Sequence, residues 1–187
     1  MSRNDHSALK TLDLVYIALF AVVIAICSWI NIPTTVPFTL QTFAVFCVLE
    51  LLGGKRGTIS ICVYILLAAI GVPVLAGFAG GVGALIGMTG GYILGFVFIG
   101  LLYWLSERLF GDKLAVRIAA MLLGLIVCYA FGTIWFMAVY AKQTGPLSIA
   151  TALSWCVLPF IIPDLGKLGL AVLLASRLRK SIHPSNR

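Results

Sequence analysis

Long apolar stretches, separated by short polar or glycine-rich segments, make up most of this chain of 187 residues. Hydrophobic side chains account for 61% of the residues and charged ones for only 10%. An ordinary soluble domain is about half apolar and about 25% charged. A water-soluble fold of this length could not bury so much apolar surface. We therefore expect an integral membrane protein with an all-α fold.

Six of the stretches are predicted to span the membrane, for which a helix needs about 20 residues. The second and the last are short by that measure, so these helices are expected to cross a locally thin region or to begin below the membrane surface. A further apolar piece, 147–160, is predicted to be a short element before the last helix. Residues 1–187 are expected to form a single membrane domain with spans at 11–30, 38–53, 57–75, 88–109, 114–141 and 163–180.

The basic residues indicate how these spans are oriented. An even number of spans puts both termini on one side, and that side collects eleven basic residues, whereas the other holds only Lys142. Cytoplasmic loops carry the excess of Lys and Arg, so both termini are expected in the cytoplasm. A seventh span would put Arg177, Arg179 and Lys180 outside and is rejected. The eleven residues are Arg3, Lys10, Lys55, Arg56, Arg108, Lys113, Arg117, Arg177, Arg179, Lys180 and Arg187.

Several catalytic classes are excluded by missing motifs. No GxxxxGK[ST] sequence is present, so the chain cannot hydrolyse ATP through a P-loop. His6 and His183 are the only histidines and lie in the polar tails, away from any nucleophile in the apolar stretches. The five cysteines stand one per apolar stretch without CxxC spacing, which favours buried apolar side chains over a metal site or disulfide. We expect neither an enzyme nor a resident cofactor or metal.

Two charged residues, Asp164 and Lys167, lie inside an apolar stretch. Each costs roughly 2.5–3.5 kcal/mol at a helix centre in the membrane. Their spacing of three residues puts them on one helical face, where they can pair. A ligand site is the favoured interpretation, and a purely structural pair is the alternative. Glu50 is expected to form an interfacial ion pair with the adjacent Lys55 and Arg56.

Two uncharged features allow more than one interpretation. Gln41 can bond to a neighbouring helix, or it can face an external cavity beside Pro33 and Pro37. The segment 77–95 holds eight of the nineteen glycines. Spacings such as Gly87/Gly91 suit close helix packing, whereas bare glycine backbone also suits a loop that closes over a ligand. The residues alone leave both questions open.

Five short motifs stand out along the chain: TVPFTLQTF at 35–43, LGGKRG at 52–57, GVPVLAGFAGGVG at 71–83, TGGYILGF at 89–96 and PDLGK at 163–167. Together they resemble the BioY family, the biotin-binding S components of energy-coupling factor (ECF) transporters. The resemblance covers about residues 12–180 in one order without large gaps, and it implies a substrate pocket that opens to the external side. One position departs from the family pattern, since Met88 stands where the family usually has proline before Thr-Gly-Gly-Tyr.

The resemblance implies a function and roles for individual residues. The chain would capture biotin outside a prokaryotic cell and deliver it for uptake with an ECF module that consists of a transmembrane coupling subunit and ATPase subunits. Gln41 and Asp164 would bond the ureido ring, and Lys167 would meet the ligand carboxylate or hold Asp164. Tyr92 would pack on the ligand, although an aromatic residue at the membrane interface is also expected there. A ligand contact is likewise assigned to Thr89.

A stripe of small residues, Ala18, Ala21 and Ala25, lies on the first predicted helix. By resemblance, this helix docks on the coupling subunit, and packing within the bundle is the equal alternative. An S component for another vitamin, a carrier that works alone, and a six-helix membrane enzyme are the competing functions.

Overall fold

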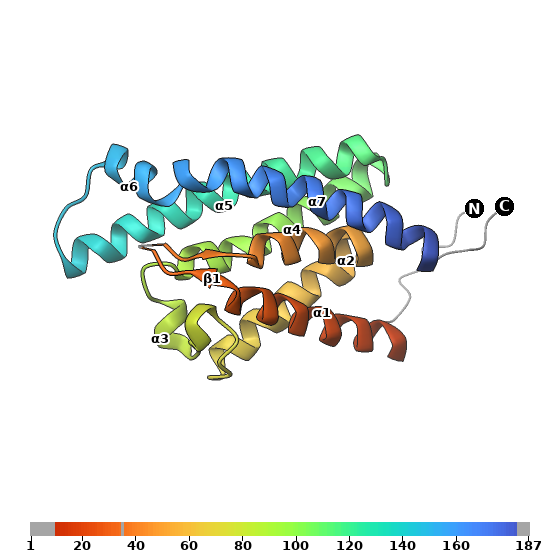
Figure 1. The fold of residues 1–187 in the computed structure, drawn as a ribbon, viewed down its shortest axis with the longest axis horizontal. Helices are drawn as coiled ribbons and strands as arrows, with labels where there is room; N and C mark the ends of the chain where they lie inside the picture. Colours follow the sequence, from red (N-terminus) through yellow and green to blue (C-terminus); the bar gives the residue numbers. More distant parts are fainter. Residues whose placement is uncertain (1–9, 35, 183–187) are drawn as a thin grey trace.

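The fold is all-helical apart from one short pair of strands, as a computed structural model of the chain shows for residues 10–34 and 36–182 (Figure 1). By length and composition, five helical segments in this part of the chain could span a membrane. Arg3, His6, His183 and Arg187 lie outside the described residues. The elements are α1 (Thr11–Trp29), β1 (Asn31–Ile32), β2 (Phe38–Thr39), α2 (Gln41–Ala69), η1 (Ala76–Phe78), α3 (Val82–Leu85), α4 (Gly90–Phe110), α5 (Leu114–Gln143), α6 (Ile149–Cys156) and α7 (Leu158–Ile182).

Helix α2 reverses direction at Gly53. This residue has φ 78° and ψ 171°, a backbone conformation that favours glycine. A Cβ atom added to Gly57 would lie 2.8 Å from a side-chain carbon of Leu49, although residues eight apart in a straight helix are separated by about 12 Å. The two halves of α2 therefore fold back on each other, as the orange and yellow segments show (Figure 1). They occupy the stretches predicted as the separate spans 38–53 and 57–75.

The last helix begins earlier than the sequence predicts. Residues 147–160 contain α6, but α7 already starts at Leu158 rather than at 163. Pro159 is the second residue of α7, where a missing N–H is tolerated. Pro163 lies inside the helix and removes one backbone hydrogen bond there. The correction places Asp164 and Lys167 in the interior of a long helix, where their side chains face its neighbours.

The main helices form one bundle in which α2 contacts α1, α4 and α7, while α4 packs along α5. α1 begins and α7 ends at the same end of this bundle (Figure 1). The reversal in α2 and the short connection between α4 and α5 lie at that end too, and they bring Lys55, Arg56, Arg108 and Lys113 there. We call it the basic end.

A buried ion pair lies near the basic end, and its partners differ from those expected. Glu50 is only 1% exposed and pairs with Arg117 of α5, with 3.4 Å between Oε1 and Nε. Arg56 instead pairs with Asp13 of α1 at 3.3 Å. The predicted pairing of Glu50 with Lys55 and Arg56 is therefore wrong, because the reversal at Gly53 turns the two basic residues away from the half-helix that carries Glu50.

The alanine stripe on α1 does not form one exposed surface. Ala21 is 0% exposed and Ala25 is 3% exposed, and both belong to the core that α1 shares with α2. Of the three alanines, Ala18 alone is exposed. For Ala21 and Ala25, this burial favours packing within the bundle over partner docking.

Candidate functional site

A cavity between α2, α4, α5 and α7 brings together all five residues that the sequence singles out for ligand binding. The loop between β1 and β2 and the segment 75–84 complete its wall. Most of the lining is apolar, with a few convergent polar groups, which is the usual composition of a small-molecule site. The five residues are Gln41, Thr89, Tyr92, Asp164 and Lys167.

The β-hairpin fixes the start of α2 at this cavity. Strands β1 and β2 pair antiparallel, with Asn31 opposite Thr39 and Ile32 opposite Phe38. Helix α2 begins two residues after Thr39, so the hairpin determines where Gln41 lies. The hydroxyl of Thr39 accepts a hydrogen bond from the backbone N–H of Gln41 and donates one to its side-chain Oε1 at 3.1 Å.

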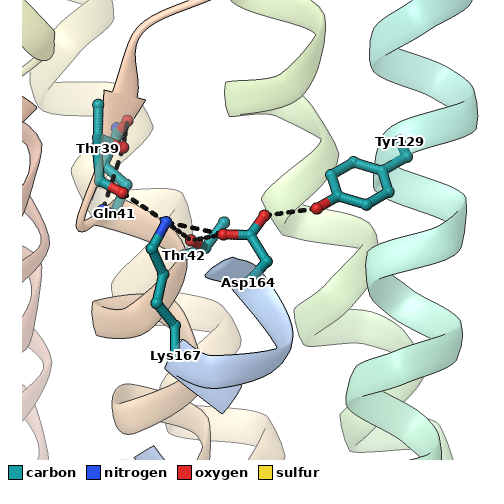
Figure 2. A network of polar contacts seen from close by, with 6 residues as sticks. All are labelled: Thr39, Gln41, Thr42, Tyr129, Asp164 and Lys167. Atoms are coloured by element: carbon teal, nitrogen blue, oxygen red, sulfur yellow. Dashed lines mark hydrogen bonds and ion pairs between the residues drawn. The ribbon is translucent and has the colours of Figure 1, made fainter. Parts of the chain in front are cut away.

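Asp164 and Lys167 form a buried ion pair at the cavity wall (Figure 2). Asp164 is 2% exposed, Lys167 is 7% exposed, and 2.8 Å separates Oδ1 from Nζ. Thr42 donates to the same Oδ1 at 2.8 Å, and Tyr129 of α5 donates to Oδ2 at 2.6 Å. The carboxylate therefore accepts three hydrogen bonds from the protein. Since an ionised carboxylate has about four acceptor positions, one remains for a ligand N–H.

All three N–H donors of the Lys167 ammonium group have acceptors within the protein (Figure 2). They are the Thr39 carbonyl oxygen at 2.7 Å, the Thr42 hydroxyl at 3.1 Å and Asp164 Oδ1 at 2.8 Å. The Phe38 ring lies on the ammonium group, with Nζ 4.3 Å from the ring centroid. Lys167 therefore ties α7 to the β2–α2 junction and holds Asp164 in place.

Gln41 retains hydrogen-bonding capacity that points to a ligand. Its side chain donates one N–H to Tyr64 and accepts one bond from Thr39. A primary amide carries two N–H donors and two acceptor lone pairs. One donor and one acceptor are thus left on a side chain that is 6% exposed and lines the cavity. If Gln41 faces a cavity, its unused donor and acceptor are available to a ligand. The other alternative, a bond to a neighbouring helix, explains only the hydrogen bond to Tyr64.

Tyr92 and Thr89 form the wall on the side of α4. The Tyr92 hydroxyl lies 3.0 Å from the hydroxyl of Thr133, and its ring rests on Gly132, where an added Cβ atom would come within 2.2 Å of the ring. Thr89 immediately precedes α4 and lines the cavity without capping the helix. Met88 and Tyr92 both pack against a small apolar cluster formed by Val36, Phe136 and Cys156.

The glycine-rich segment divides into two parts with different structural roles. Gly91 and Gly95 allow α4 and α5 to approach closely, since an added Cβ would lie 2.3 Å from Trp135 Cβ and 2.7 Å from Cys128 Sγ. Gly77 and Gly81 instead have positive φ angles of 66° and 89° in the irregular backbone near the cavity. The close-packing interpretation therefore applies to Gly91 and Gly95, and closure over a ligand stays a prediction for the segment that contains Gly77 and Gly81. We call residues 75–84 the cover segment, because four of its side chains, Leu75, Ala76, Ala79 and Ala84, line the cavity.

The end of α1 fixes the chain just before the cover segment. The Ser28 hydroxyl lies 2.5 Å from the Val74 carbonyl oxygen, and the indole N–H of Trp29 donates to the Pro73 carbonyl at 3.0 Å. The ring of Trp29 also contacts that of Phe78 within the segment, with 5.0 Å between centroids. These contacts determine where the cover segment begins.

Sequence reasoning missed four polar residues of the site: Thr39, Thr42, Tyr64 and Tyr129. A signal for Tyr129 was available, because a phenol inside an apolar stretch needs a hydrogen-bond partner when buried. The two threonines flank Gln41 within the TVPFTLQTF motif at 35–43. Among the residues that the structure describes, no group of three His, Cys, Asp or Glu side chains could hold a metal ion.

Comparisons with known proteins show the family and the fold of the chain. A model of the BioY family matches residues 1–184. The biotin transporter BioY of Thermotoga maritima is 40% identical over 173 residues, which cover 90% of this chain and 96% of that protein. The probable biotin transporter BioY of Pyrococcus horikoshii is 36% identical and covers 91% and 98%. The crystal structure of the S-component for biotin from an ECF-type ABC transporter matches with a TM-score of 0.78 at 31% identity, over 96% of this chain and 95% of that one.

Proposed function

The chain belongs to the BioY family, and on that premise we propose that it is the membrane subunit that captures biotin for an ECF transporter. It is a multi-pass membrane protein, and its relatives are named transporters rather than enzymes. In this role it binds biotin outside the cell and releases it inward, while partner subunits hydrolyse the ATP. It needs no cofactor or metal of its own.

The observation that carries the proposal is the set of hydrogen-bonding groups left over in the cavity. Gln41 retains one N–H and one acceptor position, and Asp164 retains one acceptor position. A ureido group presents one carbonyl acceptor and two N–H donors, so the three residual groups match it in number and kind. The surrounding apolar wall suits the thiophane ring and alkyl chain of biotin.

The same hydrogen-bond count assigns different tasks to the ion pair. Asp164 contacts the ligand, whereas Lys167, whose donors are occupied, acts as a positioning residue that holds the Asp164 carboxylate in its orientation. Of the two roles that the resemblance leaves to Lys167, holding Asp164 is the one this geometry supports. Tyr92 and Thr89 act on the α4 side, where they shape the wall against which the ligand packs.

The proposed topology has six crossings. The two halves of α2 serve as the second and third crossings, and α1, α4, α5 and α7 supply the others. The basic end faces the cytoplasm because it collects Lys and Arg, which puts both chain termini inside. The cavity then opens to the outside. Cysteine labelling by an impermeant reagent tests this topology: Gln143→Cys should react from outside, and Asp112→Cys only after the membrane is opened. The reverse pattern would contradict the orientation.

The exposed face of α1 is the proposed docking site for the coupling subunit, with Ala18 at its centre. Because Ala18 is exposed while Ala21 is fully buried, the two positions form a matched pair. Ala18→Trp should block assembly with the ECF module and energised uptake, yet leave biotin binding intact. Ala21→Trp should instead destabilise the bundle itself. Normal assembly of the Ala18→Trp variant would show that this face is not part of the interface.

The function is tested by equilibrium binding of labelled biotin to the purified protein in detergent. We expect saturable binding that unlabelled biotin competes away and that thiamine or riboflavin does not. Competition by another vitamin at the same concentration would favour an S component for that vitamin. A folded, monodisperse protein that binds no biotin would refute the proposal.

A further inference from the structure

Charged residues are scarce throughout the part of the chain that surrounds the cavity. None occurs between Asp13 and Glu50 or between Arg56 and Glu107, and Lys142 is the only one between Arg117 and Asp164. Among the described residues, the charged side chains that line the cavity are Asp164 and Lys167 alone. A biotin carboxylate bound here therefore has two candidate cations to consider, Lys167 and Lys142.

Lys167 is poorly placed to bind a second carboxylate. Its three N–H groups are bonded to Thr39, Thr42 and Asp164, and the Phe38 ring contacts the ammonium group as well. A ligand carboxylate would have to displace one of these buried partners. It would also meet the negative charge of Asp164, which already neutralises the lysine at 2.8 Å. The pair as a whole offers no net positive charge.

Lys142 is too far away along α5. It is exposed in the last turn of that helix, thirteen residues beyond Tyr129, which touches Asp164. At 1.5 Å per residue this separation is about 20 Å along the helix axis. Biotin itself, with its ring system included, is shorter than that even when fully extended. When the ureido ring lies at Gln41 and Asp164, its carboxylate cannot reach Lys142.

Burial of a carboxylate without a partner cation is costly, which favours a position in which the carboxylate stays hydrated. We propose that this protein, acting as the biotin-binding subunit proposed above, recognises the ureido end of its ligand and does not recognise the carboxylate by its charge. Its ligand class then includes biotin derivatives whose carboxyl group is neutral, such as biotinamide and biotin methyl ester. The alkyl chain leads the carboxyl group toward water, where an amide or ester is equally well accommodated.

Competition against labelled biotin tests this inference on the purified wild-type protein. Loss of a hydrogen bond to a charged group weakens binding by about 10- to 150-fold. We expect biotinamide and biotin methyl ester to compete with less than a tenfold loss relative to biotin. A tenfold or greater loss of affinity for both derivatives would overturn the inference, because it would show that a cation of the protein binds the carboxylate. An N-methylated ureido derivative serves as the control that must compete poorly.

The variant Lys142→Gln supplies a second, independent measurement, since this residue lies outside the proposed site. We expect its affinity for biotin to equal that of the wild type. A selective loss of affinity for biotin but not for the methyl ester would identify Lys142 as the carboxylate partner and would also overturn the inference. Failure of the proposed function is distinguishable from both results, because biotin itself would then not bind to the folded wild-type protein.

Discussion

The Asp164/Lys167 pair allows stability and ligand affinity to be separated by a double-mutant cycle. Either Asp164→Asn or Lys167→Met alone leaves a buried charge without its partner at 2.8 Å. Breaking a buried pair in this way costs about 3–5 kcal/mol of unfolding free energy. The double variant restores the charge balance, and its main remaining defect is the Thr39 carbonyl oxygen, which loses the lysine donor.

An unsatisfied buried acceptor costs about 1–3 kcal/mol. We therefore expect the double variant to be more stable than either single variant by about 2 kcal/mol, the difference between the midpoints of the two ranges. Affinity should behave differently, because all three variants disturb the carboxylate that accepts the ligand N–H. Each should bind biotin about 10- to 150-fold more weakly than the wild type.

Chemical unfolding in detergent measures the stabilities, and binding of labelled biotin measures the affinities. Gly166→Ala is the matched control on the same helix, since a Cβ atom added there has no atom within 4 Å. It should change neither quantity appreciably. A stable double variant that binds biotin like the wild type would refute the site assignment. A double variant less stable than both single variants would refute the argument from charge pairing.

Three further experiments, two substitutions and one hydrogen-exchange measurement, test neighbouring features. Gly132→Ala would bring a methyl group within 2.2 Å of the Tyr92 ring. This overpacking should lower the unfolding free energy by about 1–3 kcal/mol and weaken biotin binding. Unchanged binding would show that the Tyr92 ring does not shape the ligand wall. Glu107→Ala removes the acceptor of the Gly54 backbone N–H, which follows the α2 reversal. Unfolding assays should show a loss of about 1–3 kcal/mol of unfolding free energy, while the Kd for biotin stays the same. An increased Kd would show that the basic end is coupled to the site. Bound biotin should protect the amides of residues 75–84 from hydrogen exchange, and equal exchange in both states would count against closure of the cover segment over the ligand.

The sequence singled out two residues of the candidate site because charge is rare in this chain. A charged residue inside an apolar stretch is costly, so Asp164 and Lys167 stood out without any structural information. The structure places them in one cavity with Gln41, Thr89 and Tyr92. Tyr129 escaped notice because a tyrosine is ordinary in a membrane helix, and its importance depends on a helix 35 residues further along the chain.

Which face of each helix packs inside the bundle could not be predicted from the sequence in the same way. In a soluble helix, apolar residues mark the buried face, but lipid is as apolar as a protein core, so both faces of a membrane helix look alike. Ala18 and Ala21 differ only in which of them faces α2. Glu50 was paired with its sequence neighbours for a related reason. The predicted spans place a reversal after residue 53, but nothing local shows that α5 packs beside Glu50 and brings Arg117 close to it.

The reversal at Gly53 also constrains how the protein enters the membrane during synthesis. The halves of α2 run over residues 41–52 and 54–69, and each is shorter than the roughly 20 residues that a lone transmembrane helix needs. Neither half is long enough to partition into lipid as an independent helix, so the two must insert together as a hairpin. Glu50 enters with that hairpin, before α5 has been made. Its permanent partner Arg117 arrives only after the ribosome has added 67 more residues, and until then the nascent hairpin carries a carboxyl group that α5 cannot yet neutralise.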